Sequence, residues 1–216
     1  MKRRIAEVYN ALSRAYGPQD WWPAEDAFEM MVGAILIQHT AWRNAEKALD
    51  NLRRAGLLEP QRLLRISGPR LAALIRPAGM PRVKTKRLGN FLRWYQKQGG
   101  FEDLQRRATP DLRSELLAVN GIGRETADDV LVYAFRRPVF VVDAYARRIF
   151  RRFGLISGAE GYEEIRKRIE GAMPDDPHRL GEFHALLVAH AKATCRSRPL
   201  CDGCCLRRRC ARNLEG

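Results

Sequence analysis

All five cysteines of this 216-residue chain lie in its last part, in the arrangement Cys195-x5-Cys201-x2-Cys204-Cys205-x4-Cys210. The segment is short and polar, so it cannot bury the thiols as small hydrophobic side chains. Four of them, with the spacing C-x5-C-x2-C-x5-C, form a ligand set that can fold one loop around one metal centre. Cys195, Cys201, Cys204 and Cys210 are therefore candidate metal ligands, and Cys205 is left over.

The chain is strongly basic, with 39 Lys and Arg against 25 Asp and Glu and a formal net charge of +14. Such an excess is typical of proteins that bind a polyanion, and we expect nucleic acid. A membrane is the weaker alternative, because the longest apolar run, near Met30–Ile37, is too short to span a bilayer and no signal segment opens the chain. We expect a cytoplasmic, nucleoid-associated protein, whose clustered cysteines bind metal and do not form disulfides.

Apolar residues follow a helical period almost throughout the chain. Gly-Pro, Pro-Ala-Gly, Gly-Gly and Asn-Gly sequences separate the periodic segments. The only strand-like run, Val139–Val142, is short and isolated, so we interpret it as a buried connector. The pattern predicts an all-α fold with helices at Ala27–Ile37, Asn44–Arg54, Leu71–Ile75, Lys84–Gln96, Arg113–Val119, Thr126–Phe135, Ala144–Phe153, Tyr162–Ala172 and Leu180–Ala193.

A glycine-containing turn, Asn120-Gly-Ile-Gly123, separates two of these helices. Gly121 and Gly123 permit backbone conformations that other residues resist, and Ile122 is an apolar pin between the helices. The N–H groups of such a turn, with the N-terminus of the next helix, can bind a phosphate without reading base sequence. A tight turn without any ligand is the alternative.

Asp143 directly follows the apolar connector. A carboxylate at the end of a buried run has a fixed position, and the connector could return it towards the glycine-containing turn. Asp143 is therefore a candidate catalytic residue. It is also a candidate N-cap of the helix Ala144–Phe153, and the two roles are compatible.

Three features in this order resemble the helix-hairpin-helix DNA glycosylase superfamily that includes endonuclease III. They are Gly121-Ile-Gly123 with Thr126-Ala127, then Val141-Val-Asp143, then the cysteine loop. The resemblance extends from about residue 28 to residue 210. It implies a two-lobed helical fold with the site in the cleft between the lobes. The central lobe, 23–137, contains the hairpin, and the second combines 1–22 with 138–216 and ends in the cluster loop at 195–210.

The resemblance also implies a cofactor. Cys195, Cys201, Cys204 and Cys210 match the ligands of that family's [4Fe–4S] cluster, although the first gap is one residue shorter than in endonuclease III. Zinc is the alternative, and it is less favoured because zinc sites usually show two close ligand pairs where this chain has a single C-x2-C.

Three residues match positions with known roles in the superfamily. Asp143 matches the catalytic aspartate, which stabilises the oxocarbenium character of the sugar or orients water. Glu125 stands where bifunctional members carry a nucleophilic lysine, and a carboxylate cannot form a Schiff base. Gln38 matches the residue that fills the space left by the extruded nucleotide. The other residues expected to contact DNA are His39, Gly121, Gly123, Arg124 and Thr126.

Tryptophans near the first core helix point to one branch of the superfamily. Trp21-Trp22-Pro23 and Trp42, with Glu125 in the hairpin and Phe183-His-Ala-Leu186 before the cysteines, resemble the alkylpurine branch, of the 3-methyladenine DNA glycosylase III type. The resemblance implies that Trp22 and Trp42 stack on the damaged base, and that Trp21, Glu125 and Lys192 line its pocket. Ordinary core packing of the tryptophans is the alternative.

These observations lead to one expected function. We expect a monofunctional DNA glycosylase that acts as a monomer on double-stranded DNA and removes a damaged base, namely an alkylated purine. The alternatives are a glycosylase for an oxidised pyrimidine or a deaminated purine, and a non-catalytic DNA-binding module. Asp143 argues against the last, because binding alone does not need a carboxylate beside phosphates.

Overall fold

The computed structural model describes residues 1–211, and residues 212–216, the end of the expected second lobe, lie outside the described residues. The described chain is helical and contains no strand, as the apolar period predicted. None of its helices is long and apolar enough to cross a membrane.

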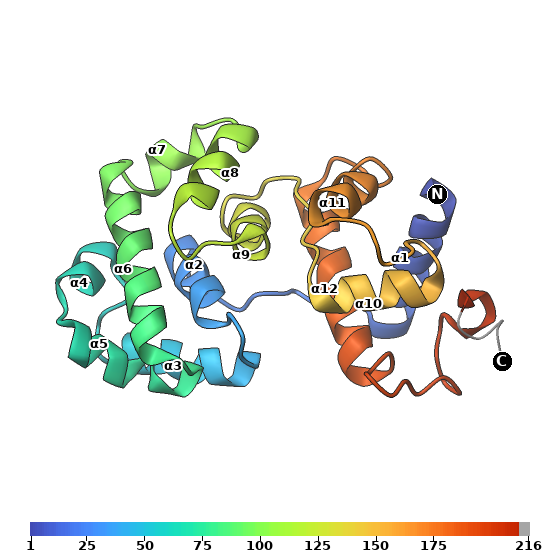
Figure 1. Ribbon diagram of the computed structural model, residues 1–216, viewed down its shortest axis with the longest axis horizontal. Helices are drawn as coiled ribbons and strands as arrows, with labels where there is room; N and C mark the ends of the chain where they lie inside the picture. The colour runs from blue at the N-terminus through green and yellow to red at the C-terminus, as the bar shows by residue number, and fades with distance from the viewer. Residues whose placement is uncertain (212–216) are drawn as a thin grey trace. The chain divides into compact units, whose positions relative to one another are not determined.

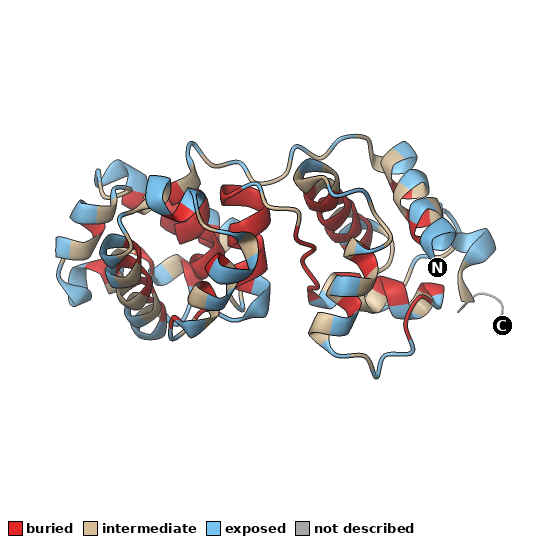
Figure 2. Ribbon diagram, turned by 90° about the horizontal axis from the view of Figure 1, so that it is seen from above, coloured by how far each residue is buried: buried red, intermediate tan, exposed pale blue. Residues whose placement is uncertain are grey.

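The chain forms two compact units, and it passes between them twice. Unit 1 consists of Met1–Trp21 and Arg136–Gly216, and unit 2 is the continuous segment Trp22–Phe135. The family resemblance predicts these crossings one or two residues later, at 22/23 and 137/138. In each unit the buried residues lie on the inner helix faces and the exposed ones on the outer faces (Figure 2).

Unit 2 is built around α2 (Figure 1). This helix is buried on almost every residue, which its continuous apolar sequence requires, and the Asp26 carboxylate caps it by accepting a hydrogen bond from the Glu29 N–H at 2.8 Å. The elements of the unit are α2 (Ala27–Leu36), α3 (Trp42–Arg54), α4 (Pro60–Arg65), α5 (Gly68–Leu74), η1 (Arg76–Ala78), α6 (Pro81–Lys97), α7 (Phe101–Gln105), α8 (Thr109–Ala118), α9 (Arg124–Asp129) and the π-helical turn η2 (Val130–Ala134).

Unit 1 packs α1 (Lys2–Tyr16) and α10 (Ala144–Phe153) against α12 (Pro177–Ala193), with α11 (Tyr162–Glu170) and η3 (Arg207–Arg209) completing it. Its core includes the rings of Phe140, Phe150 and Phe183, whose centroids lie 5.6 to 6.0 Å apart. Helix α10 ends at Gly154, whose φ of 74° is left-handed and suits glycine.

Two sequence expectations need correction. The predicted helix Thr126–Phe135 is α9 followed by a π-helical turn, because the backbone shifts to wider hydrogen bonds from Val130 onward. The structure also contains helices that the pattern did not indicate, namely α1, α4 and α7. The connector Val139–Val142 is confirmed as buried and not a strand.

Candidate active site and DNA-binding hairpin

Asp143 is delivered by the buried connector of unit 1. A buried segment outside regular structure needs partners for its N–H groups. The Phe140 N–H donates to the Glu170 carboxylate at 2.9 Å, and the Val142 N–H donates to the Tyr162 hydroxyl at 3.3 Å. Helix α11 therefore fixes the backbone that leads into Asp143.

The Asp143 side chain is buried, and one of its two oxygens is bound by the start of α10. Its Oδ1 accepts a hydrogen bond from the Ala146 N–H at 2.6 Å, so Asp143 is the N-cap of α10, as expected. Its Oδ2 lies 3.6 Å from Nε2 of His184 on α12, too far for a hydrogen bond. No sequence pattern indicates His184 as a neighbour of Asp143, because nothing in the chain predicts that α12 lies beside the connector. The result is a carboxylate of fixed position with one oxygen committed to the helix.

The turn between α8 and α9 depends on Gly121 and not on Gly123. Gly121 has a φ of 102°, and a Cβ there would lie 2.4 Å from Cγ of Arg87. Gly123 has a φ of −91° and a ψ of 177°, an extended conformation that any residue adopts. The expectation that Gly123 needs an unusual backbone is therefore wrong. A Cβ there would meet nothing within 4 Å, so its contribution is open space at the start of α9.

Gln38 is tied to this hairpin within unit 2. Its Nε2 donates to the Gly121 carbonyl at 3.1 Å and to the Thr126 hydroxyl at 2.9 Å, while its Oε1 accepts from Arg87 at 2.5 Å. In this structure the Gln38 amide therefore braces the hairpin. Any insertion into DNA must exchange these three hydrogen bonds.

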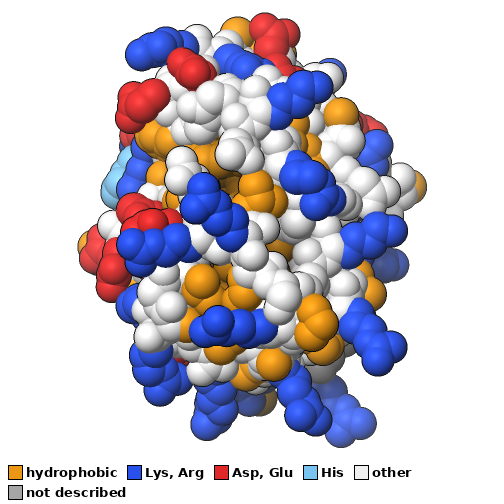
Figure 3. All heavy atoms as spheres, turned by 90° about the vertical axis from the view of Figure 1, so that its left-hand side faces the viewer, with side chains coloured by type: hydrophobic (Ala, Val, Ile, Leu, Met, Phe, Trp, Pro, Cys, Tyr) orange, Lys and Arg blue, Asp and Glu red, His pale blue; other side chains and the backbone are white. Residues whose placement is uncertain are grey.

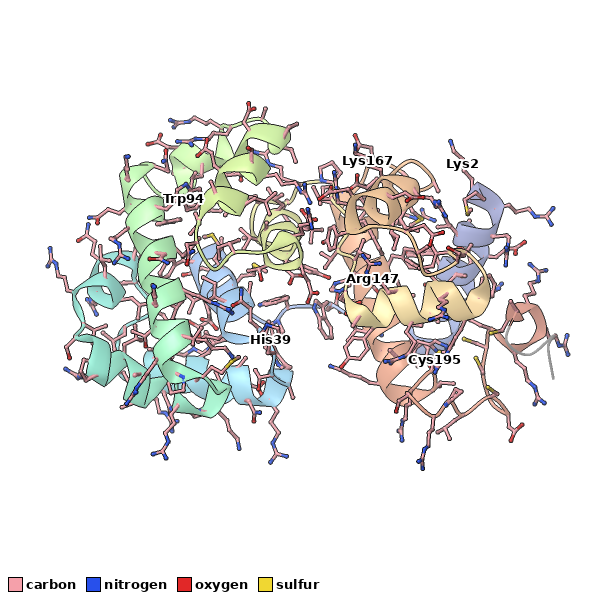
Figure 4. All side chains as sticks on the ribbon, viewed as in Figure 1. Lys2, His39, Trp94, Arg147, Lys167 and Cys195 are labelled. Atoms are coloured by element: carbon pink, nitrogen blue, oxygen red, sulfur yellow. The ribbon has the colours of Figure 1, made fainter. Side chains whose placement is uncertain are left out.

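Other residues expected at the DNA surface differ in exposure. His39 and Arg124 are exposed, and His39 has a φ of 55°, a left-handed conformation that costs a non-glycine residue energy. Thr126 is buried, with its hydroxyl facing Gln38. His39 follows α2 in the loop before α3 (Figure 4).

Lys84 holds two loops of unit 2 together from the inside. It is fully buried, and its Nζ donates to the Leu36 carbonyl at 2.7 Å and to the Ala78 carbonyl at 2.6 Å. These carbonyls lie at the ends of α2 and η1, where helical partners are missing. Burial, together with the nearby Arg87 charge, lowers the pKa of Lys84 to about 8. The lysine thus fixes the loop that carries Gln38 and His39.

The expected base-stacking tryptophans, Trp22 and Trp42, lie against each other in unit 2. Their ring centroids are 5.4 Å apart with a 73° interplanar angle, and Trp22 also packs 5.4 Å from Tyr133. A base held between two rings needs about 7 Å between them, twice a van der Waals contact. A sandwiched base therefore requires Trp22 or Trp42 to move. Tyr133 is a third aromatic member of this cluster, and no sequence pattern links it to the two tryptophans.

The remaining residues expected to line the base pocket occupy different surroundings. In unit 1, Lys192 is exposed and its Nζ lies 5.4 Å from the centroid of the Trp21 ring. The indole Nε1 atoms of Trp21 and Trp22 are buried and donate no hydrogen bond within the described chain. In unit 2, Glu125 is exposed in the first turn of α9, where its charge favours the helix N-terminus.

The four expected ligand cysteines line one cavity of unit 1, and Cys205 does not. The cavity is walled by apolar residues such as Ile149, Phe153 and Leu206, and Cys205 is exposed. Within residues 1–211, no three His, Cys, Asp or Glu side chains are close enough together to hold a single metal ion. A [4Fe–4S] cluster differs in that each thiolate binds its own iron, so its ligands stand further apart. The four thiols and the mostly apolar lining of the cavity fit such a cluster.

The surface is basic outside these sites as well. The face drawn in Figure 3 carries many Lys and Arg side chains, and its Asp and Glu side chains lie mainly along the top and the left of the view. This agrees with the net charge of +14. Such a surface attracts a polyanion over long range.

Comparison with known proteins identifies the family. The family model described as "HhH-GPD superfamily base excision DNA repair protein" matches residues 32–175. A Methanocaldococcus jannaschii protein with the provisional name of a DNA repair glycosylase is 44% identical over 209 residues, covering 95% of each chain. Endonuclease III of Thermotoga maritima is 31% identical over 187 residues, covering 86% of this chain and 83% of its own.

A solved structure agrees with these matches. The H. pylori 3-methyladenine DNA glycosylase MagIII, bound to 1,N6-ethenoadenine, superposes with a TM-score of 0.77 and 28% identity, covering 87% of this chain and 97% of its own. Three findings point to the same family: the helical fold with its hairpin, the matched family model, and the identity of the relatives over most of the chain. The chain belongs to the HhH-GPD superfamily of base excision DNA repair proteins.

Proposed function

We propose that this protein is a monofunctional DNA glycosylase that extrudes an alkylated purine from double-stranded DNA and hydrolyses its N-glycosidic bond. The observation that carries the proposal is the Asp143 carboxylate, which is buried, fixed by the Ala146 N–H and placed at the end of a buried connector. A protein that only binds DNA would need this carboxylate for no more than the capping of α10.

The proposed reaction needs few groups. The bond between C1′ and the base nitrogen breaks, the base leaves with the bonding electron pair, and positive charge develops on the sugar. Asp143 stabilises that charge electrostatically, and water then adds its oxygen to C1′ and releases a proton. A cationic alkylated purine leaves as a neutral base, so it needs no strong general acid. This is consistent with a site that offers one fixed carboxylate.

The aromatic cluster supports a flat, cationic substrate. The faces of Trp22, Trp42 and Tyr133 offer stacking surface, and aromatic rings attract a positive charge. The buried indole N–H groups of Trp21 and Trp22 can donate to acceptor atoms of a purine. The likeness to a 3-methyladenine glycosylase bound to 1,N6-ethenoadenine, a flat but uncharged modified purine, supports the stacking part of this proposal.

The hairpin supports DNA binding through the backbone. The open space at Gly123 and the exposed Arg124 at the start of α9 suit a phosphate. We propose that Gln38 exchanges its hydrogen bonds with the hairpin for contacts in the gap left by the extruded nucleotide. The exposed His39 lies beside it in the chain.

The absence of a lyase step is part of the proposal. The superfamily position of the nucleophilic lysine holds Glu125, which cannot form a Schiff base. Lys84 cannot substitute, because its Nζ is fully buried and bonded to two carbonyls. Borohydride should therefore trap no covalent adduct on damaged DNA, and a trapped adduct would mean a different nucleophile.

The cysteine cavity completes the proposal. Cys195, Cys201, Cys204 and Cys210 would hold a [4Fe–4S] cluster. When bound, the cluster supplies cross-links that order the basic C-terminal loop. Purified protein should be brown and contain iron.

The test is an excision screen with oligonucleotide duplexes that each carry one damaged base. The panel includes 3-methyladenine, 7-methylguanine, ethenoadenine, an oxidised pyrimidine and a deaminated purine. The wild type should release the alkylated purines. Release of only the oxidised or deaminated base would refute the substrate class, and release of none would refute the activity.

Asp143→Asn tests the mechanism. The amide keeps the size of the side chain and its oxygen can still cap α10, so fold and DNA affinity should change little. Base release under single-turnover conditions should fall by a factor of about 100 or more, in line with the loss of an electrostatic transition-state contact. Unchanged release would exclude Asp143 from the reaction.

A further inference from the structure

We propose that four arginines of α10 form a second phosphate-binding site, which holds the DNA backbone beside the target nucleotide. A cavity of about 770 Å³ lies in unit 1 and is lined by Arg147, Arg148, Arg151 and Arg152, the loop 156–158 and Ala211. None of these residues belongs to the hairpin, the aromatic cluster or the cysteine ligands. Arg147 is labelled on α10 in Figure 4.

Three of the arginines are held in place by backbone carbonyls. Arg147 donates to the Glu160 carbonyl at 3.0 Å, and Arg148 Nε donates to the Cys195 carbonyl at 2.9 Å. Arg152 donates to the carbonyls of residues 196 and 197 at 2.5 and 2.9 Å. These contacts fix the guanidinium groups before any ligand arrives, which reduces the entropy lost on binding.

The positive charge of the cavity is not neutralised from within. In residues 1–211, no carboxylate forms an ion pair with any of the four arginines. The carboxylate of the neighbouring Glu160 is used elsewhere, because it accepts from the N–H groups of Ser157 and Gly158 and pairs with Arg168. A guanidinium has five donors, and Arg151 uses none of its own on the described chain. Arg147 uses only one end of its fork. Both can therefore bind a phosphate in bidentate fashion.

The spacing of residues along α10 places this cavity close to Asp143. The link to the reaction rests on the proposed function. Arg147 and Arg151 follow the cap Asp143 by four and eight residues, so they share a helix face with it. With a rise of 1.5 Å per residue, they stand about 6 and 12 Å along the axis from Asp143. If Asp143 faces the sugar of the target nucleotide, this row meets neighbouring phosphates of the same strand.

The test combines arginine variants with neutralised phosphates. Arg147→Gln/Arg151→Gln is compared with the control Arg65→Gln/Arg70→Gln, which removes two exposed arginines of unit 2 at the same cost in charge. Binding is measured to duplexes that carry an uncleavable abasic-site analogue and one methylphosphonate at each flanking position in turn. The salt dependence of binding is measured in parallel.

We expect the wild type to lose affinity when particular flanking phosphates are neutralised. The α10 double variant should be insensitive at those positions, bind about tenfold more weakly and show a salt slope smaller by about 0.9 for each lost contact. The control double variant should keep the positional sensitivity of the wild type. Equal sensitivity in all three proteins would overturn the inference.

Two further outcomes are separable. Thermal unfolding with added inorganic phosphate or pyrophosphate tests whether the ligand of the arginine cavity is a free phosphate ion and not a DNA phosphate. Stabilisation of the wild type but not of the α10 variant, without positional sensitivity on DNA, would make this a free-phosphate site and overturn the DNA proposal. Failure of the glycosylase proposal would show instead as no base release by the wild type, whatever the methylphosphonate result.

Discussion

The fully buried Lys84 should make the stability of unit 2 depend on pH in a direction that is unusual for a lysine. Its folded-state pKa of about 8 lies below its ordinary value of 10.5, because burial disfavours the charged form. Between these values the unfolded chain binds more protons than the folded chain. The free energy of unfolding should therefore rise with pH from about 8 to 10.5.

The magnitude follows from the same difference. The difference between the ordinary pKa of 10.5 and the folded-state pKa of about 8 corresponds to about 3 kcal/mol, by which folding disfavours the charged form of Lys84 relative to the neutral form. The hydrogen bonds survive the loss of the proton, because a neutral amine still has two N–H groups for the carbonyls of Leu36 and Ala78. At high pH the free energy of unfolding therefore increases, because the folded chain no longer buries a charge and Lys84 keeps both hydrogen bonds.

The assay compares Lys84→Met with the wild type. At pH 7 this substitution has opposing effects, since it removes two hydrogen bonds as well as a buried charge, so the informative quantity is the pH dependence. The free energy of unfolding in urea is followed by tryptophan fluorescence from pH 7 to 10, without oxygen. The difference between wild type and variant should shift in favour of the wild type by up to about 3 kcal/mol as the pH rises.

The exposed Lys86 on the same helix supplies the control. Lys86→Met should give a curve parallel to the wild type over the whole range. If the Lys84→Met curve is equally parallel, then Lys84 keeps its proton as easily in the folded chain as in the unfolded one, and the reasoning from burial fails.

Two matched pairs give further predictions. Gly121→Ala should lower the free energy of unfolding by about 1–3 kcal/mol, because the φ is left-handed and the new Cβ collides with Arg87, whereas Gly123→Ala should leave stability within about 0.5 kcal/mol and weaken DNA binding. Equal thermal stability of the two variants would contradict this. Cys204→Ser should abolish bound iron and the brown absorption band, while Cys205→Ser should retain both, because Cys204 lines the cavity and Cys205 does not. Iron content by elemental analysis decides the second pair.

The sequence was sufficient to predict those features that depend on residues close together in the chain. Helix α10 begins after Asp143 and ends before Gly154, as an N-cap aspartate and a terminal glycine indicate. The connector before it is buried because its residues are apolar and flanked by helices. The spacing of four cysteines indicated a common site, and these four do line one cavity.

Other features depend on partners that are distant in the chain. Nothing near Gln38 in the sequence reveals that Gly121, Thr126 and Arg87 use its amide. Trp22 and Trp42 were expected to stack on a base, and their contact with each other depends on how the helices of unit 2 pack. A lysine in an amphipathic helix is normally exposed, so the burial of Lys84 had no visible signal.

The order of segments in the two units has a consequence for synthesis on the ribosome. Unit 2 is one continuous stretch, so its core can form as soon as Phe135 has emerged. Unit 1 is split, and the buried face of α1 (Ile5, Val8 and Leu12) packs against α12, made some 160 residues later. At about 5–20 residues per second, this apolar face waits roughly 8–30 seconds for its partner. During synthesis, unit 2 can therefore fold before unit 1. Until α12 has been made, the apolar face of α1 has no core to pack against and can be bound by chaperones.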